Sequence, residues 1–169
     1  MNTTQLNHSD TAFKKRKFPI VLVCDNISKA PNIGSLFRLA DAFGIEKIMF
    51  CGHNIPLGRR MTKTSRSTDK VVTYETHADS LNIVQHLKTE HFTIVSLEIT
   101  SNSVPMHQQR FDNQPIALVI GDENHGVSDA ILKISDKVIH IDMFGHNSSM
   151  NVVQATSIAL YEITKQLSS

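Results

Sequence analysis

The hydrophobic residues of this chain fall into five short runs separated by longer and more polar stretches. Val, Ile and Leu dominate the runs without strict alternation with polar residues, which is typical of strands that are covered on both faces. We therefore predict buried strands at residues 19–25, 47–52, 92–97, 116–121 and 137–141.

Helical periodicity occupies the stretches between these runs. Apolar residues at 33, 36, 37, 40 and 43 share one stripe, Asn32 is the predicted N-cap, and Gly44 provides a stop. Further helices are predicted at 78–88, 128–134 and 151–166. The alternation of strands and helices predicts an α/β fold, with a largely parallel sheet flanked by helices.

The predicted helix at 151–166 is apolar over much of its circumference near its start. A helix of this kind is buried on more than one side. Its apolar surface could pack against the sheet, or against a partner subunit, and the periodicity alone leaves both open.

A single domain is the expectation for residues 18–169, since 169 residues with 40% apolar content suffice for one core. Residues 1–17 are polar and then basic, which indicates a flexible extension. No leader-like apolar segment and no stretch long enough to span a membrane is present, so we expect a cytoplasmic protein without a membrane partner.

Charge is distributed unevenly along the chain, although the net charge is only +1. Residues 1–70 carry twelve Lys/Arg and five Asp/Glu, whereas residues 71–169 carry five and eleven. The basic residues cluster in the extension and in a predicted loop at 59–70. Such clusters suit RNA phosphates, but a solvated surface explains them equally well at this stage. The candidate RNA-binding residues are Lys14, Lys15, Arg16, Lys17, Arg59, Arg60, Lys63 and Arg66.

Several function classes are disfavoured by the absence of their motifs. The chain has no Gly-x-Gly-x-x-Gly, no phosphate-binding P-loop and no Gly-x-Ser-x-Gly. Cys24 and Cys51 lie in apolar runs, which predicts that both are buried, and the histidines form no ligand cluster, so no metal is expected. Ligands of open α/β sheets bind beyond the carboxyl ends of the strands. That rule directs attention to the loops at 25–32, 121–126 and 143–149.

Three segments at these positions together resemble the signature motifs of the SpoU/TrmH family of knotted SPOUT methyltransferases. They are Asn32-Ile-Gly-Ser-Leu-Phe-Arg38, Leu118-Val-Ile-Gly-Asp-Glu-Asn-His-Gly126 and Ile141-Asp-Met-Phe-Gly-His-Asn-Ser-Ser-Met-Asn-Val152. Their order and spacing carry the resemblance, which covers about residues 18–167. One departure is Asp142, which stands where the family usually has proline and adds a charge beside the expected cofactor loop.

The resemblance implies an S-adenosylmethionine-dependent enzyme that methylates a ribose 2′-hydroxyl in tRNA or rRNA. It also implies a homodimer and a C-terminal trefoil knot, in which the last helix threads through an earlier loop. The cofactor would be held in the knot, largely by backbone groups, without a metal. The residues that the resemblance assigns to cofactor binding are Leu97, Ile120, Gly121, Ile141, Met143, Ser149 and Met150.

The resemblance assigns catalysis to Arg38, with Asn32, Glu123 and Asn151 shaping the pocket. Because guanidinium groups hardly ever lose a proton at neutral pH, we expect Arg38 to bind a phosphate, orient the hydroxyl and stabilise its developing negative charge. The residues alone also permit simpler interpretations. Arg38 could pair with Asp41 at the surface, Glu123 could cap a helix or bind loop amides, and both asparagines could be N-caps.

Two other functions stay open on the sequence. One is a non-catalytic RNA-binding dimer that has kept the fold. The other is a knotted methyltransferase that modifies a base of the RNA. A test of S-adenosylmethionine binding would distinguish the enzyme from the non-catalytic dimer. The position of the methyl group in the modified nucleotide would distinguish ribose methylation from base methylation.

Overall fold

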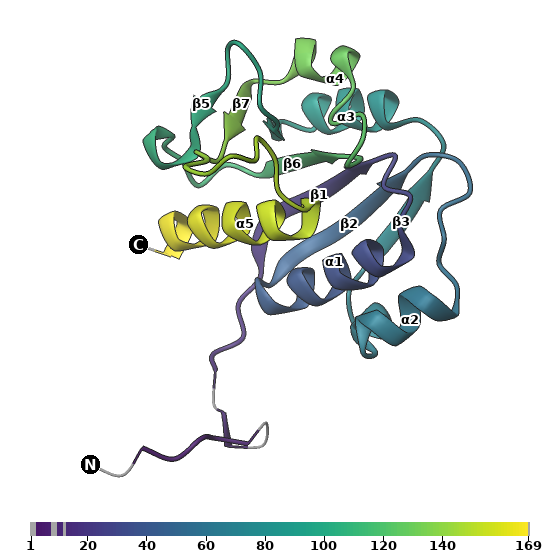
Figure 1. The fold of residues 1–169 in the computed structure, drawn as a ribbon, viewed down its shortest axis with the longest axis vertical. Helices are drawn as coiled ribbons and strands as arrows, with labels where there is room; N and C mark the ends of the chain where they lie inside the picture. Colours follow the sequence, from purple (N-terminus) through teal and green to yellow (C-terminus); the bar gives the residue numbers. More distant parts are fainter. Residues whose placement is uncertain (1–2, 8–9, 12, 169) are drawn as a thin grey trace.

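The computed structural model describes residues 3–7, 10–11 and 13–168. Its centre is a seven-stranded sheet in the order β3-β2-β1-β6-β4-β7-β5, and every neighbouring pair of strands is parallel (Figure 1). The strands are β1 (Phe18–Asp25), β2 (Ile45–Cys51), β3 (Tyr74–His77), β4 (Thr93–Leu97), β5 (Val104–Pro105), β6 (Ile116–Gly121) and β7 (Lys137–His140).

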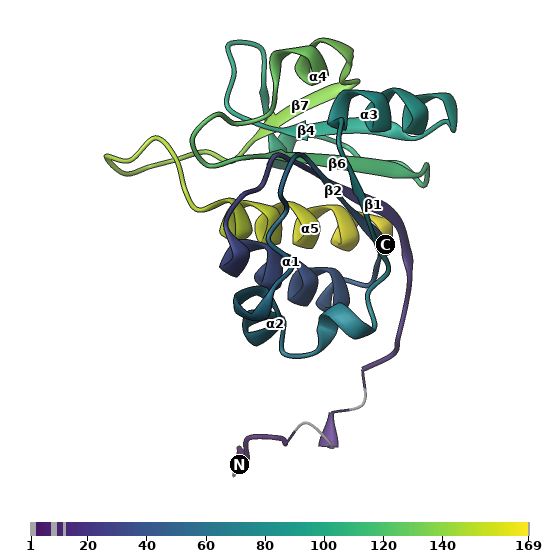
Figure 2. The same ribbon diagram turned by 90° about the vertical axis from the view of Figure 1, so that its right-hand side faces the viewer.

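Helices cover both faces of the sheet. One face carries α1, α2 and α5, and the opposite face carries α3 and α4 (Figures 1 and 2). The helices are α1 (Ala30–Ala42), α2 (Arg59–Ser65), α3 (Ser80–Thr89), α4 (Asp129–Ile134) and α5 (Val152–Ser168), with short 3-10 turns η2 (Thr68–Lys70) and η3 (Met106–Gln108). The predicted α/β class with a parallel sheet is confirmed.

Two apolar cores explain why the strands lack strict alternation. In β1, Ile20, Leu22 and Cys24 pack toward α1 and α5, whereas Val21 and Val23 pack toward α3 and α4. Because side chains of a strand alternate between faces, a strand covered on both sides must be apolar at every position. The five predicted strands are confirmed, with ends that differ by at most two residues.

The two remaining strands lie at the edges of the sheet and were not predicted. The burial pattern of β3 is half exposed, and its sequence Tyr-Glu-Thr-His contains no apolar run. Strand β5 has only two residues, one of them a proline, which edge strands tolerate. Edge strands are covered on fewer sides, so their sequences carry less hydrophobic signal.

The prediction of a loop across residues 59–70 is wrong, because this segment contains α2 and η2. Helix α2 packs against α1 at Gly34, where a Cβ atom would lie 2.5 Å from the Met61 carbonyl oxygen and 2.7 Å from the Thr64 Cβ. The helix presents mainly polar residues, with only Met61 and Ser65 buried. A single buried apolar side chain gives too little periodicity for a helix to be predicted.

The predicted N-cap at Asn32 is also wrong. Helix α1 begins at Ala30 after the capping residue Lys29, with a proline in its first turn. Proline suits this position because the first helical residues have no intrahelical partner for their N–H groups. Asn32 lies inside the first turn, and its side chain is therefore available for other contacts.

Helix α5 packs against α1 and against strands β4 and β6. Ala159, Leu160 and Ile163 are fully buried, whereas Ile158 and Tyr161 are 42% and 62% exposed. The sheet thus covers one side of the helix and leaves an apolar stripe at the surface. Among the described residues, no helix is long and apolar enough to cross a bilayer.

The end of the basic segment contacts the folded body. Arg16 Nη2 donates to the Leu167 carbonyl oxygen at 2.8 Å, and Lys17 Nζ donates to the Ile45 carbonyl oxygen at 3.0 Å. Lys14 and Lys15 are exposed. Of the four cations, only these two are therefore available without breaking a contact, and the flexibility of the residues before Arg16 stays a prediction.

Both cysteines are buried, as predicted. Burial raises the pKa of the Cys51 thiol to about 12 and that of Cys24 well above its ordinary value. A thiol that stays protonated is a poor nucleophile. The two residues therefore act as small apolar side chains of the core.

Candidate functional site

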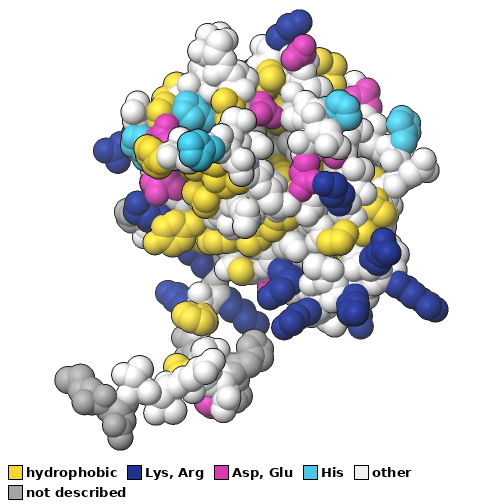
Figure 3. All heavy atoms as spheres, viewed as in Figure 1, with side chains coloured by type: hydrophobic (Ala, Val, Ile, Leu, Met, Phe, Trp, Pro, Cys, Tyr) yellow, Lys and Arg dark blue, Asp and Glu magenta, His cyan; other side chains and the backbone are white. Residues whose placement is uncertain are grey.

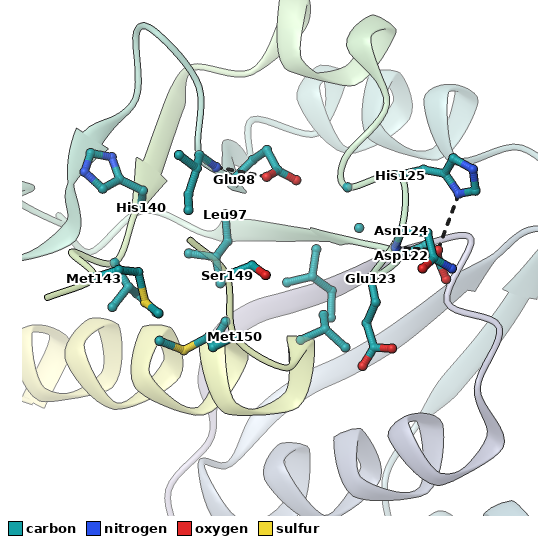
Figure 4. Close-up of a pocket in the computed structure, with 17 residues that line it drawn as sticks. Leu97, Glu98, Asp122, Glu123, Asn124, His125, His140, Met143, Ser149 and Met150 are labelled. Atoms are coloured by element: carbon teal, nitrogen blue, oxygen red, sulfur yellow. Dashed lines mark hydrogen bonds and ion pairs between the residues drawn. The ribbon is translucent and has the colours of Figure 1, made fainter. Parts of the chain in front are cut away.

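A cavity of about 340 Å³ lies at the carboxyl edge of the sheet, beyond the ends of β4, β6 and β7 (Figure 4). Because all strands are parallel, their carboxyl ends meet at this edge, and the loops that follow them form one site. Its wall is formed by residues 97–99 and 120–126, together with His140, Ile141, Met143, Ser149, Met150, Val152 and Ala155. These segments come from three of the loops that follow buried strands.

All seven residues predicted to bind the cofactor line this one cavity. They are Leu97, Ile120, Gly121, Ile141, Met143, Ser149 and Met150. The cavity also includes residues that the sequence did not indicate, among them Glu98 and His140. Their assignment to the cofactor stays a prediction, but the structure brings them together from three separate segments.

Two glycines let the loop after β6 fold back closely onto the end of that strand and onto the Glu98 side chain. A Cβ atom on Gly121 would lie 1.9 Å from the carbonyl carbon of Gly126 and 2.2 Å from the Val127 nitrogen. Gly126 has a φ of +67°, and a Cβ atom there would lie 2.3 Å from Glu98 Oε2. The loop can keep this tight shape only with glycine at both positions.

Beside the cavity, Glu123 joins the three motif segments. Its Oε1 accepts hydrogen bonds from Asn32 Nδ2 at 3.0 Å and from Asn151 Nδ2 at 2.6 Å, and its Oε2 pairs with Lys29 Nζ. Asn151 Nδ2 also lies 3.4 Å from Asn32 Oδ1. We call Asn32, Glu123 and Asn151 the motif cluster.

These contacts decide between the simpler interpretations of the same residues. The cap or loop-amide role for Glu123 is wrong, because its carboxylate binds two asparagine amides and a lysine. Asn151 is both a cap and a cluster residue, since its Oδ1 also accepts from the Val153 N–H at 2.9 Å. Lys29 is a contact of the cluster that the sequence did not indicate.

Arg38 lies six residues after Asn32 on α1, about 9 Å further along the helix axis. Its side chain is exposed, and within the described part of the chain it makes no hydrogen bond or ion pair, so the alternative interpretation as a surface pair with Asp41 is wrong. A long cationic side chain without a protein partner can bind an incoming anion at little cost. Arg38 forms no hydrogen bond or ion pair with the motif cluster, and its role at the site stays a prediction.

Two aspartates support the loops of the site. Asp25, 1% exposed, accepts hydrogen bonds from the Ser80 hydroxyl at 2.7 Å and the Ser128 N–H at 2.9 Å, which ties β1 to the starts of α3 and α4. Asp122 accepts from Ser28 and Asn124. Partial burial works to raise the pKa of Asp122, but these hydrogen bonds hold it below its ordinary value. Through these hydrogen bonds, Asp25 and Asp122 fix the positions of the loops around the site.

The unusual Asp142 faces two histidines. Its Oδ2 lies 3.3 Å from His107 Nδ1, and its Oδ1 lies 3.5 Å from His140 Nε2. The carboxylate is thus directed to η3 and to the end of β7.

The candidate RNA-binding residues of α2 are exposed, as are those of the basic segment. Arg59, Arg60, Lys63 and Arg66 project from α2 and its C-cap, on the same side of the molecule as α1. Figure 3 shows Lys and Arg side chains gathered over the lower part of the molecule, around α2 and the N-terminal segment. Among the residues with described positions, no group of three or more His, Cys, Asp or Glu side chains could hold a metal ion.

Comparison with known proteins agrees with the geometry of the site. Residues 19–161 match the model of the SpoU rRNA Methylase family. The chain is 30% identical over 156 residues to a tRNA (guanosine(18)-2′-O)-methyltransferase from Aquifex aeolicus, with 90% of this chain and 72% of the relative covered.

Solved structures share the fold. The crystal structure of the A. aeolicus TrmH/SpoU tRNA modifying enzyme superposes with a TM-score of 0.83 at 28% identity, covering 91% of this chain and 78% of that one. The SpoU methyltransferase AviRb from Streptomyces viridochromogenes, in complex with the cofactor AdoMet, gives a TM-score of 0.79 at 23% identity, covering 96% and 66%. With the family match spanning most of the sheet and all three motif segments, the chain belongs to the SpoU rRNA Methylase family.

Proposed function

We propose that this protein is an S-adenosylmethionine-dependent methyltransferase that methylates a ribose 2′-hydroxyl in tRNA or rRNA, in the cytoplasm. The observation that carries the proposal is the cavity at the sheet edge with the motif cluster beside it. A methyl donor and an acceptor hydroxyl can meet there. Membership of the SpoU family and the 30% identity to a tRNA ribose methyltransferase support the same reaction.

The cavity fits a nucleoside cofactor. Its volume of about 340 Å³ lies in the usual range for small-molecule sites. Gly121 and Gly126, which allow the loop to fold this tightly, both line the cavity and can offer it only backbone atoms. Met143, Met150 and Ile141 offer apolar surface for an adenine ring. When bound, S-adenosylmethionine would supply an electrophilic methyl group on sulfur.

The protein's own contribution is placement of the acceptor. Glu123 holds Asn32 and Asn151 in fixed positions, and their amides can contact the incoming nucleotide. Arg38 binds a phosphate, orients the 2′-hydroxyl and stabilises its negative charge as the proton leaves to solvent. Arg38 is not the base, because its guanidinium keeps its proton at neutral pH.

The first prediction is that the purified protein binds S-adenosylmethionine in the presence of a chelator. The sulfonium group already activates the methyl group, and no group of three or more His, Cys, Asp or Glu side chains among the described residues could hold a metal ion. Titration calorimetry measures this directly. Mass spectrometry of RNA nucleosides from cells with and without the gene then identifies the product. Absence of binding at millimolar ligand would favour a non-catalytic RNA-binding protein, and a methylated base would favour a base-modifying enzyme.

We propose that RNA binds across α2 and the basic segment. Replacing Lys14 and Lys15 by alanine should weaken RNA binding and flatten its salt dependence, by about 0.7 to 0.9 in slope for each phosphate that is no longer neutralised. These two lysines are exposed, whereas Arg16 and Lys17 also hold the fold. The measurement is the affinity for unfractionated tRNA at several salt concentrations. Lys133→Ala, at an exposed lysine on α4, is the control and should leave the slope unchanged.

We also propose a homodimer formed through α5, whose exposed Ile158 and Tyr161 would be covered by the second copy. Sedimentation at micromolar concentration should therefore give a dimer, and Ile158→Asp should shift it toward monomer because a charge would be buried. A folded wild-type monomer would disprove the proposal. Independently of the dimer, we propose that α5 passes through an earlier loop of the chain and so forms a trefoil knot.

A further inference from the structure

We infer that Glu98 recognises the ribose of the methyl donor by accepting hydrogen bonds from its 2′- and 3′-hydroxyls. The inference rests on the proposed function and identifies the residue that reads the sugar of the cofactor. Glu98 directly follows β4 and lines the cavity, next to Leu97 and opposite the loop after β6 (Figure 4).

The carboxylate of Glu98 is held in place on both sides. Its Oε1 accepts from the Ile99 N–H at 2.9 Å, and its Oε2 accepts from the Val127 N–H at 2.9 Å. Gly126 leaves space for this carboxylate, since a Cβ atom there would lie 2.3 Å from Oε2. The side chain thus bridges two loops of the cavity in one fixed orientation, which is what preorganised recognition requires.

Glu98 still has capacity for a ligand. A carboxylate offers about four acceptor sites, and the two backbone amides use one on each oxygen. Within the described part of the chain, no Lys, Arg or His forms an ion pair with Glu98. A vicinal diol carries two adjacent O–H donors, which match the two oxygens of a carboxylate.

The location of the motif cluster indicates which part of the cofactor meets Glu98. The methyl group must face Glu123 and its partners, because the acceptor hydroxyl is placed there. The ribose is joined to the sulfur through a single carbon atom, so the sugar lies beside the loop at 122–127. Glu98 contacts this loop at Gly126 and Val127. The sugar therefore comes within reach of its carboxylate.

The test compares three ligands by calorimetry: S-adenosylhomocysteine, its 2′,3′-dideoxy analogue and methylthioadenosine. The wild-type protein should bind the diol at least about tenfold more tightly than the dideoxy analogue, the effect of a hydrogen bond to a charged group. In Glu98→Gln, this preference should fall to about twofold or less, while a melting curve confirms folding. Glu90→Gln, the same change at the exposed end of α3, should keep the wild-type preference.

The outcomes separate this inference from the proposed function. Wild-type binding of S-adenosylhomocysteine without a diol preference overturns the role of Glu98 and leaves the methyltransferase standing. The role of Glu98 is also overturned if Glu98→Gln weakens the binding of S-adenosylhomocysteine and of its dideoxy analogue equally. Glu98 would then only hold the loop in place. If Glu98→Gln weakens S-adenosylhomocysteine but leaves methylthioadenosine unaffected, Glu98 binds the amino group and the inference is overturned. Complete absence of wild-type binding overturns the proposed function itself.

Discussion

Arg38→Ala is expected to reduce methyl transfer by about a hundredfold or more, while the protein stays folded. The reduction corresponds to the loss of one charged hydrogen-bond donor that contacts the transition state. Truncation opens no cavity, because the side chain is exposed and has no partner in the described part of the chain, so stability should change by less than about 1 kcal/mol. Single-turnover transfer to the identified RNA, beside a melting curve, measures both quantities.

Two variants serve as controls for Arg38→Ala. Arg38→Lys keeps the charge but not the planar pair of donors, and should restore little activity. Asp41→Ala changes an exposed residue about one turn further along α1 and should have almost no effect. Near-normal turnover in a folded Arg38→Ala protein would contradict the proposed mechanism, since it would leave Arg38 as an ordinary surface charge.

Gly121→Ala is expected to weaken cofactor binding by more than about a hundredfold and to lower the free energy of unfolding by several kcal/mol. A methyl group at Gly121 would lie 1.9 to 2.2 Å from backbone atoms of Gly126 and Val127, and backbone cannot rotate away as a side chain can. Either the loop at 122–127 moves or β6 does, and both line the cavity. Calorimetry with S-adenosylmethionine and thermal melting would show the two effects.

Gly145→Ala is the matched control, because no atom lies within 4 Å of the position that its Cβ would occupy. Its effect on both measurements should be small. If Gly121→Ala bound the cofactor as well as Gly145→Ala does, the close approach of the loop could not be a requirement of the site.

The parts of the fold that could be predicted are those in which burial leaves a mark on the sequence. Strand β1 is apolar up to Cys24 because helices cover both of its faces, and it was predicted to within a residue. Strand β3 and helix α2 are partly exposed, so their polar residues resemble those of loops. The start of α1 was misplaced because Asn32 suits a cap by its chemistry, whereas Pro31 and Lys29 decide where the helix begins.

The site was predicted through the resemblance rather than through periodicity. The second and third motifs supply much of the cavity lining, and Asn32 of the first motif contacts Glu123 of the second. Arg38 forms no such contact, and its role stays a prediction. The contact of Lys29 with Glu123 and the bridging role of Glu98 depend on how two loops fold across each other. No local pattern in the sequence records such a contact, because its partners lie 94 and 29 residues apart.

The motif cluster also sets a limit on when activity can begin during synthesis. Glu123 joins Asn32 to Asn151, and these asparagines are 119 residues apart in the chain. Parallel sheets with such distant pairings fold slowly, because the chain must close long loops before the contacts stabilise it. A nascent chain on the ribosome therefore has no assembled site until residue 151 has left the exit tunnel. Until residue 151 has emerged, a newly made molecule is inactive, even if much of its sheet has already formed.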